Sequence, residues 1–108
     1  LLTKLLSAAA RDDTPRLRAA LTGLPVAGFT GTLDDRYRVG ATRIAAGEVR
    51  AKTGSLTGVS TLAGVVRDTD GRLLAFALLA DRVPAGGTRG AEAALDALAT
   101  ALSRCGCH

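Results

Sequence analysis

The sequence predicts an α+β fold in which a three-stranded antiparallel sheet packs against helices. Apolar residues recur at helical spacing near both ends of the chain, and three strand-like runs lie between residues 48 and 81. Two turn signals, at residues 57–58 and 68–71, separate these runs by so few residues that we expect a meander. With 108 residues, the chain forms at most one domain with a modest core.

Leucines at positions 1, 2, 5 and 6 predict an apolar helix over residues 1–10. The run has no initiating methionine, charged leader or small-residue cleavage site, so we expect the protein to begin upstream. A second helix is predicted from Pro15, whose missing N–H costs nothing at a first helical position, to about Gly23. Its expected caps are Asp13 or Thr14, and its expected buried residues are Leu17 and Leu21.

Residues 24–32 are rich in glycine, proline and threonine and predict a loop. One helical turn is expected over residues 34–38, followed by an irregular stretch through Gly47. After the strands, residues 84–90 predict a second loop, and Thr88 or Gly90 opens the last helix. The apolar positions that this helix should lay across the sheet are Ala91, Ala94, Leu95, Leu98 and Leu102.

The three strands are predicted over residues 48–56, 59–68 and 72–81. Gly64 lies in the second strand, and because it has no side chain to pack, we expect a bulky group to cross it. Residues 73–79 are apolar on both faces, which predicts a central strand that is covered on both sides.

The tetrad Lys52-Thr53-Gly54-Ser55 on the first strand has the features needed to hold an extended peptide. Side chains two apart on a strand share a face, so the hydroxyls of Thr53 and Ser55 should lie together. Gly54 leaves room for a second backbone, which could add to the strand edge and place its carboxylate at these hydroxyls. Lys52, one of two lysines beside twelve arginines, adds a compact cation whose pKa shifts readily.

Two consecutive segments resemble a known family. They are residues 52–64, K-T-G-S-L-T-G-V-S-T-L-A-G, and the V-V-R-D-T-D-G-R-L-L-A-F-A-L-L that follows. They are similar to the third-motif region of the S13 serine-type D-alanyl-D-alanine carboxypeptidases, which are penicillin-binding proteins. Residues 24–33, L-P-V-A-G-F-T-G-T-L, resemble the segment that precedes this motif. The resemblance implies that residues 1–108 are the C-terminal part of a penicillin-binding-protein-like transpeptidase or β-lactamase fold, whose sheet has further strands from the N-terminal part.

The same resemblance implies a role for each residue of the tetrad. Lys52 would stand beside the nucleophilic serine and support proton transfer, and Thr53 and Ser55 would hold the terminal carboxylate of the substrate. Gly54 would belong to the substrate-binding strand, and the backbone N–H of Ser55 would be the second oxyanion donor. The family more often has threonine at position 55, and serine keeps the hydroxyl that would bind the carboxylate but lacks the methyl group.

The implied activity is D-alanyl-D-alanine carboxypeptidase action, with or without endopeptidase action, on peptidoglycan stem peptides through a serine acyl-enzyme. β-Lactams would be ligands, export to the cell envelope is implied, and no cofactor or metal is expected. The family's other motifs, S-x-x-K and S-x-N, are absent from these 108 residues, which contain no asparagine. We therefore expect the chain alone to be inactive and to pack against the N-terminal part of the same enzyme. The alternative is a non-catalytic α+β interaction module that binds a peptide at its sheet edge.

The net charge of +4 does not predict nucleic-acid binding, because the arginines are scattered among acids and only three aromatic residues could stack on bases. The longest apolar run, residues 73–80, is too short to span a bilayer. At the C-terminus, Cys105-Gly106-Cys107-His108 leaves three interpretations open. They are a metal site without its second ligand pair, a strained mutual disulfide, and a disulfide to an upstream cysteine outside this sequence.

Overall fold

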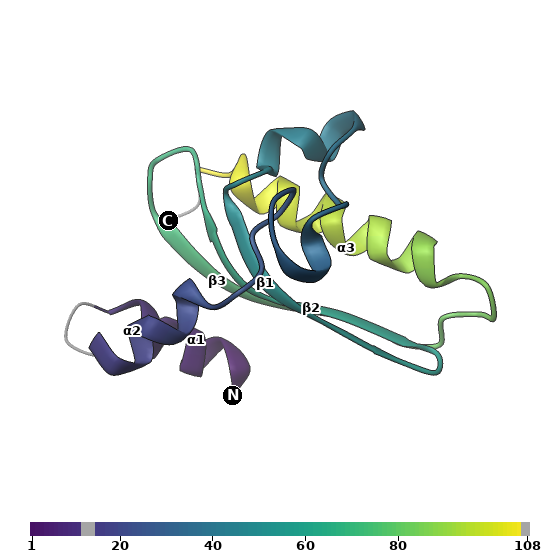
Figure 1. The fold of residues 1–108 in the computed structure, drawn as a ribbon, viewed down its shortest axis with the longest axis horizontal. Coiled ribbons are helices and arrows are strands. Elements are labelled where there is room, and N and C mark those ends of the chain that lie inside the picture. The colour runs from purple at the N-terminus through teal and green to yellow at the C-terminus, as the bar shows by residue number, and fades with distance from the viewer. Residues whose placement is uncertain (12–14, 107–108) are drawn as a thin grey trace.

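The computed structural model describes residues 1–11 and 15–106 and confirms the α+β class (Figure 1). The elements are α1 Leu2–Ala10, α2 Pro15–Thr22, β1 Val49–Leu56, β2 Val59–Arg67, β3 Leu73–Ala80 and α3 Thr88–Ser103, with 3₁₀ helices over Gly31–Leu33 and Gly40–Ala45. The strand predictions are therefore confirmed to within one residue at each end. Four residues for which the sequence suggested roles lie outside the described residues, namely Asp13, Thr14, Cys107 and His108. Cys105, which is described, is disulfide-bonded.

The sheet is an antiparallel meander in the order β1-β2-β3, with register pairs such as Lys52 with Ala63. The turn between β2 and β3 is fixed by a buried carboxylate. One oxygen of Asp68 accepts the N–H groups of Asp70 and Arg72, at 2.9 and 2.8 Å. This local hydrogen bonding explains why the turn could be predicted from the sequence.

The central strand of the described sheet is β2, so the prediction that β3 is the central strand is wrong here. β3 lies at an edge, and its residue Leu79 is 72% exposed. In a meander the second strand in sequence is also the middle strand in space, so two apolar faces do not indicate a central position. One face of β3 packs through Phe76 into the core under α3, and the other face lies on the side of α1.

The main core lies between the sheet and α3, and the hairpin of α1 and α2 lies on the opposite face of the sheet (Figure 1). Full burial of each leucine or valine in this core stabilises the fold by about 1.5–3 kcal/mol. On the opposite face, Leu21 is buried as predicted, whereas Leu17 is 41% exposed. The fully buried leucines and valines of the main core are Leu33, Val49, Leu62 and Val66.

The helix α3 begins at Thr88, one of the two predicted positions, and lies across the sheet as expected. Leu95 and Ala99, four residues apart, face the core, whereas Leu98 is 53% exposed and Ala94 is also exposed. The stripe that meets the sheet is therefore narrower than the apolar stripe in the sequence. No helix in the described ranges is long and apolar enough to cross a membrane.

Two local predictions are corrected by backbone geometry. A Cβ on Gly64 would lie 2.0 Å from the carbonyl oxygen of Arg50, so the neighbouring backbone of β1, not a bulky side chain, requires this glycine. The helical turn expected over residues 34–38 lies earlier, at Gly31–Leu33. Tyr37 has a φ of 62°, in the left-handed region, so a right-handed turn cannot continue through it.

Candidate active site

Residues 24–38, which we call the strap, cross the edge of β1 and pair with its first half. The Ala27 N–H donates to the Val49 carbonyl at 2.9 Å, and the Ala51 N–H donates to the Pro25 carbonyl at 3.0 Å. These bonds show that the backbone groups of Val49 and Ala51 point away from β2 and toward the strap. The segment expected to be a plain loop thus contributes a short bridge to the sheet.

The same edge of β1 is open beyond Ala51. Backbone groups of alternate residues on a strand point to the same side, so those of Thr53 and Ser55 also point away from β2. Within the described ranges, no other backbone group pairs with Thr53 or Ser55 there. An extended peptide could therefore pair with this edge, and the Ser55 N–H is available as a donor.

The polar side chains of the tetrad converge on this open edge. Thr53 and Ser55 lie on the face of the sheet that carries the buried Val49, with Thr53 half-buried and Ser55 exposed. Lys52 lies on the opposite face, but its ammonium group folds over the edge and donates to the Thr53 carbonyl at 2.8 Å. One cation, two hydroxyls and the Ser55 N–H thus lie along the same short stretch of β1, and their role in binding a substrate stays a prediction.

At Gly54, a side chain would meet a neighbouring residue of the sheet itself. A Cβ at this position would lie 2.4 Å from the Thr61 hydroxyl oxygen, which belongs to the paired residue on β2. The Thr61 hydroxyl donates to the Gly54 carbonyl at 3.5 Å. The Thr61 hydroxyl therefore occupies the space that a side chain at position 54 would fill. This contact is separate from the room for a substrate backbone that the sequence analysis expected at Gly54.

A contact that the sequence did not predict reaches the tetrad from the strap. The hydroxyl oxygens of Thr32 and Thr53 are 2.9 Å apart, within hydrogen-bond distance. Thr32 is part of the G-T-L that ends the upstream segment resembling the family, and this was the one signal that could have pointed to it.

A largely buried ion pair attaches the strap to α3. The Arg36 Nε donates to the Asp96 carboxylate at 2.9 Å, and a second guanidinium nitrogen bonds the other carboxylate oxygen. Burial alone would lower the pKa of Arg36, but the hydrogen bond and the charge of Asp96 outweigh burial, so the pKa is raised. The adjacent Tyr37 is buried, and its hydroxyl has no hydrogen bond of good geometry. Burial, and then the charge of Asp96, raises the pKa of Tyr37 and keeps the phenol neutral.

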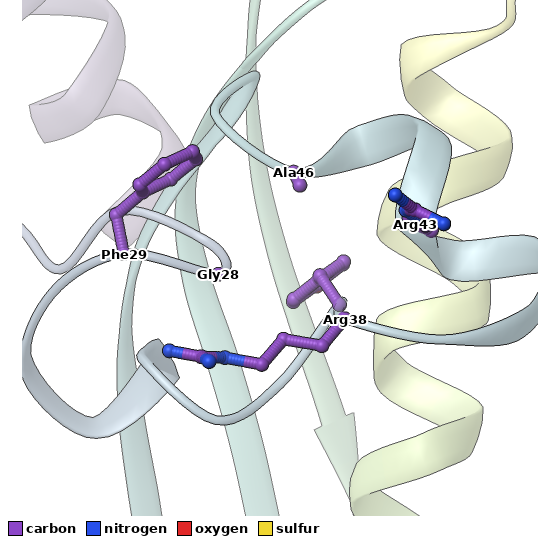
Figure 2. Close-up of a pocket in the computed structure, with 6 residues that line it drawn as sticks. Gly28, Phe29, Arg38, Arg43 and Ala46 are labelled. Atoms are coloured by element: carbon purple, nitrogen blue, oxygen red, sulfur yellow. The ribbon is translucent and has the colours of Figure 1, made fainter.

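A pocket with a volume of about 530 Å³ lies between the strap and the segment that follows it, and Figure 2 shows the residues that line it. Phe29 and Arg38 border it from the strap, and Arg43 and Ala46 border it from the following segment. No residue of the tetrad lines this cavity, so the candidate site is the open edge of β1 and not the cavity. Arg38 and Arg43 could not be singled out from the sequence as pocket residues, because the sequence has twelve arginines.

The sequence model of the D-Ala-D-Ala carboxypeptidase 3 (S13) family matches residues 1–102. The chain belongs to the S13 family. Carboxypeptidase DacB of Mycolicibacterium smegmatis is 49% identical over 108 residues, which cover 98% of this chain and 22% of that protein. Carboxypeptidase Rv3627c of Mycobacterium tuberculosis is 47% identical and is matched over 94% of this chain and 22% of its own length. This S13 chain therefore spans about a fifth of these relatives.

Solved structures agree with the S13 assignment. Penicillin binding protein 4 (dacB) of Haemophilus influenzae superposes with a TM-score of 0.76 at 25% identity, over 95% of this chain and 23% of that one. The same protein complexed with a β-lactam gives a TM-score of 0.66 at 26% identity, over 86% of this chain and 22% of that one. The resemblance read from residues 24–79 is thus confirmed at the level of family and fold.

Proposed function

We propose that this chain supplies the substrate-binding and oxyanion strand of a serine-type D-alanyl-D-alanine carboxypeptidase acting on peptidoglycan stem peptides. The observation that carries the proposal is the open edge of β1, where Lys52, Thr53 and Ser55 converge in a chain of the S13 family. The names of the mycobacterial relatives, both carboxypeptidases, support this reaction class.

The geometry suggests how each group would act. A stem peptide would extend along the edge of β1 and place its terminal carboxylate at the hydroxyls of Thr53 and Ser55, near the charge of Lys52. The Ser55 N–H would donate to the carbonyl oxygen of the scissile bond as negative charge develops on it. One preorganised donor of this kind lowers the barrier by about 2.7–4 kcal/mol. Lys52 would support proton transfer at the nucleophile.

The nucleophile would come from the rest of the enzyme, since these 108 residues lack S-x-x-K and S-x-N. Apolar side chains exposed on the described part of the chain support a covering partner segment. They lie on α1 and at both ends of β3, and they are Leu2, Leu5, Leu73 and Leu79. We therefore propose that residues 1–108 form the C-terminal part of a catalytic domain that works in the cell envelope after export. The β-lactam complex of the Haemophilus protein supports β-lactams as ligands.

The test is covalent labelling by a fluorescent penicillin. The full-length enzyme should give a stoichiometric, serine-linked adduct, while the 108-residue chain alone should give none because it lacks an activated nucleophile. An adduct on the isolated chain would refute the proposal that the nucleophile lies in the rest of the enzyme. If the full-length protein binds peptides ending in D-Ala-D-Ala but forms no adduct, the non-catalytic interaction module is the better account.

A further inference from the structure

We infer that Thr32 is a positioning residue that orients the Thr53 hydroxyl toward the carboxylate of the substrate. The inference rests on the proposed function and extends it to a residue outside the tetrad. Its basis is the 2.9 Å separation of the two hydroxyl oxygens, which joins residues 21 apart in sequence.

The strap holds Thr32 firmly enough for such a role. Leu33, the next residue, is fully buried, and its carbonyl accepts the Gly28 N–H at 2.9 Å. On the other side, Gly31 packs so closely on the Pro25 ring that a Cβ would lie 2.8 Å from a ring carbon. Because Pro25 also accepts the hydrogen bond from β1, Thr32 has a fixed position relative to that strand.

The direction of the hydrogen bond follows from the chemistry of the ligand. An ionised carboxylate only accepts hydrogen bonds, so Thr53 must donate its single hydroxyl proton to the carboxylate. Thr53 can then only accept from Thr32, which gives the chain Thr32 O–H to Thr53 O–H to carboxylate. A hydroxyl that accepts one hydrogen bond donates a stronger one, so Thr32 should strengthen carboxylate binding without touching the carboxylate. Lys52 donates one of its three ammonium protons to the backbone carbonyl of Thr53, so it makes no hydrogen bond to the Thr53 hydroxyl here.

The experiment measures steady-state kinetics of the full-length enzyme on a short acylated peptide ending in D-Ala-D-Ala and on its C-terminal amide. Thr32→Val should raise KM for the free carboxylate about 5-fold, the equivalent of one ordinary hydrogen bond, with kcat within about 2-fold. Thr32→Ser, which keeps the hydroxyl, should restore KM. The amide should show a smaller rise in KM, because its carbonyl oxygen accepts a hydrogen bond but carries no charge.

Two controls separate positioning from a general disturbance of the fold. Thr42→Val removes a half-buried hydroxyl that bonds the Val39 carbonyl away from the site, and it should leave KM unchanged. Thr32→Val on a Thr53→Val background should cause no further rise in KM, because its effect passes through Thr53. A further 5-fold rise on that background, or an equal rise for the amide, would overturn the inference alone. Absence of peptide cleavage by the unaltered enzyme would overturn the proposed function and the inference together.

Discussion

Replacing Ser55 by alanine and by proline should separate the two roles proposed for this residue. Alanine removes the hydroxyl and keeps the backbone N–H, whereas proline removes both. The Ser55 N–H points away from β2, so proline breaks no hydrogen bond of the sheet ladder, and edge positions tolerate it. The preceding Gly54 is already in a strand, the conformation that a following proline favours. Both variants should therefore fold.

The expected magnitudes differ clearly. Loss of one hydrogen bond to a charged carboxylate corresponds to about 1.5–3 kcal/mol, so Ser55→Ala should slow acylation about 10- to 150-fold. Loss of an oxyanion donor corresponds to a further factor of about 100 to 1,000, which Ser55→Pro alone should show. The assay is the second-order rate of acylation by a labelled penicillin, with thermal midpoints measured to confirm folding. If Ser55→Ala is as damaging as Ser55→Pro, the backbone-donor role of Ser55 is wrong.

Three further predictions concern neighbouring groups. Lys52→Ala should lower kcat and slow acylation, and Lys52→Arg should not fully restore either, since arginine does not deprotonate; a fully active Lys52→Arg would contradict the proton-transfer role. Gly54→Ala should destabilise the sheet by about 1–3 kcal/mol, and adding Thr61→Ala to it should relieve most of that loss, because the clash is with the Thr61 hydroxyl. Equal unfolding free energies for the Gly54→Ala variant and the Gly54→Ala, Thr61→Ala double variant would exclude this clash. Because burial raises the pKa of Tyr37, its phenol should ionise only in the unfolded state as pH rises above about 10, so the free energy of unfolding should fall there. Tyr37→Phe should abolish this fall, and an unchanged pH profile of the unfolding free energy in that variant would assign the fall to other groups.

The strands could be predicted because their signals are local. Alternation of apolar and polar residues fixes which residues are extended, and the Asp68 turn is made by bonds within four residues. The edge position of β3 and the true width of the α3 stripe could not be predicted in the same way. Leu98 has the right spacing but lies beside the contact with the sheet, and the position of Leu79 depends on which strands pair with β3.

The candidate site was predicted in part for the same reason. The shared face of Thr53 and Ser55 follows from the two-residue period of a strand. The Thr32 contact joins segments 21 residues apart, and the ion pair of Arg36 with Asp96 joins segments 60 residues apart. Such contacts depend on the path of the strap, which turns through the left-handed conformation of Tyr37, and no periodicity in the sequence encodes that path.

The most direct test of the central claim is a crystal structure of the full-length enzyme acylated by a β-lactam that carries a carboxylate. The acyl carbonyl oxygen should lie about 2.7–3.1 Å from the Ser55 nitrogen, the range expected of an oxyanion donor. The carboxylate should lie within hydrogen-bond distance of the Thr53 and Ser55 hydroxyls. An acyl oxygen bound by donors outside β1, or an edge of β1 at Thr53 and Ser55 already paired with another strand of the enzyme, would contradict the account.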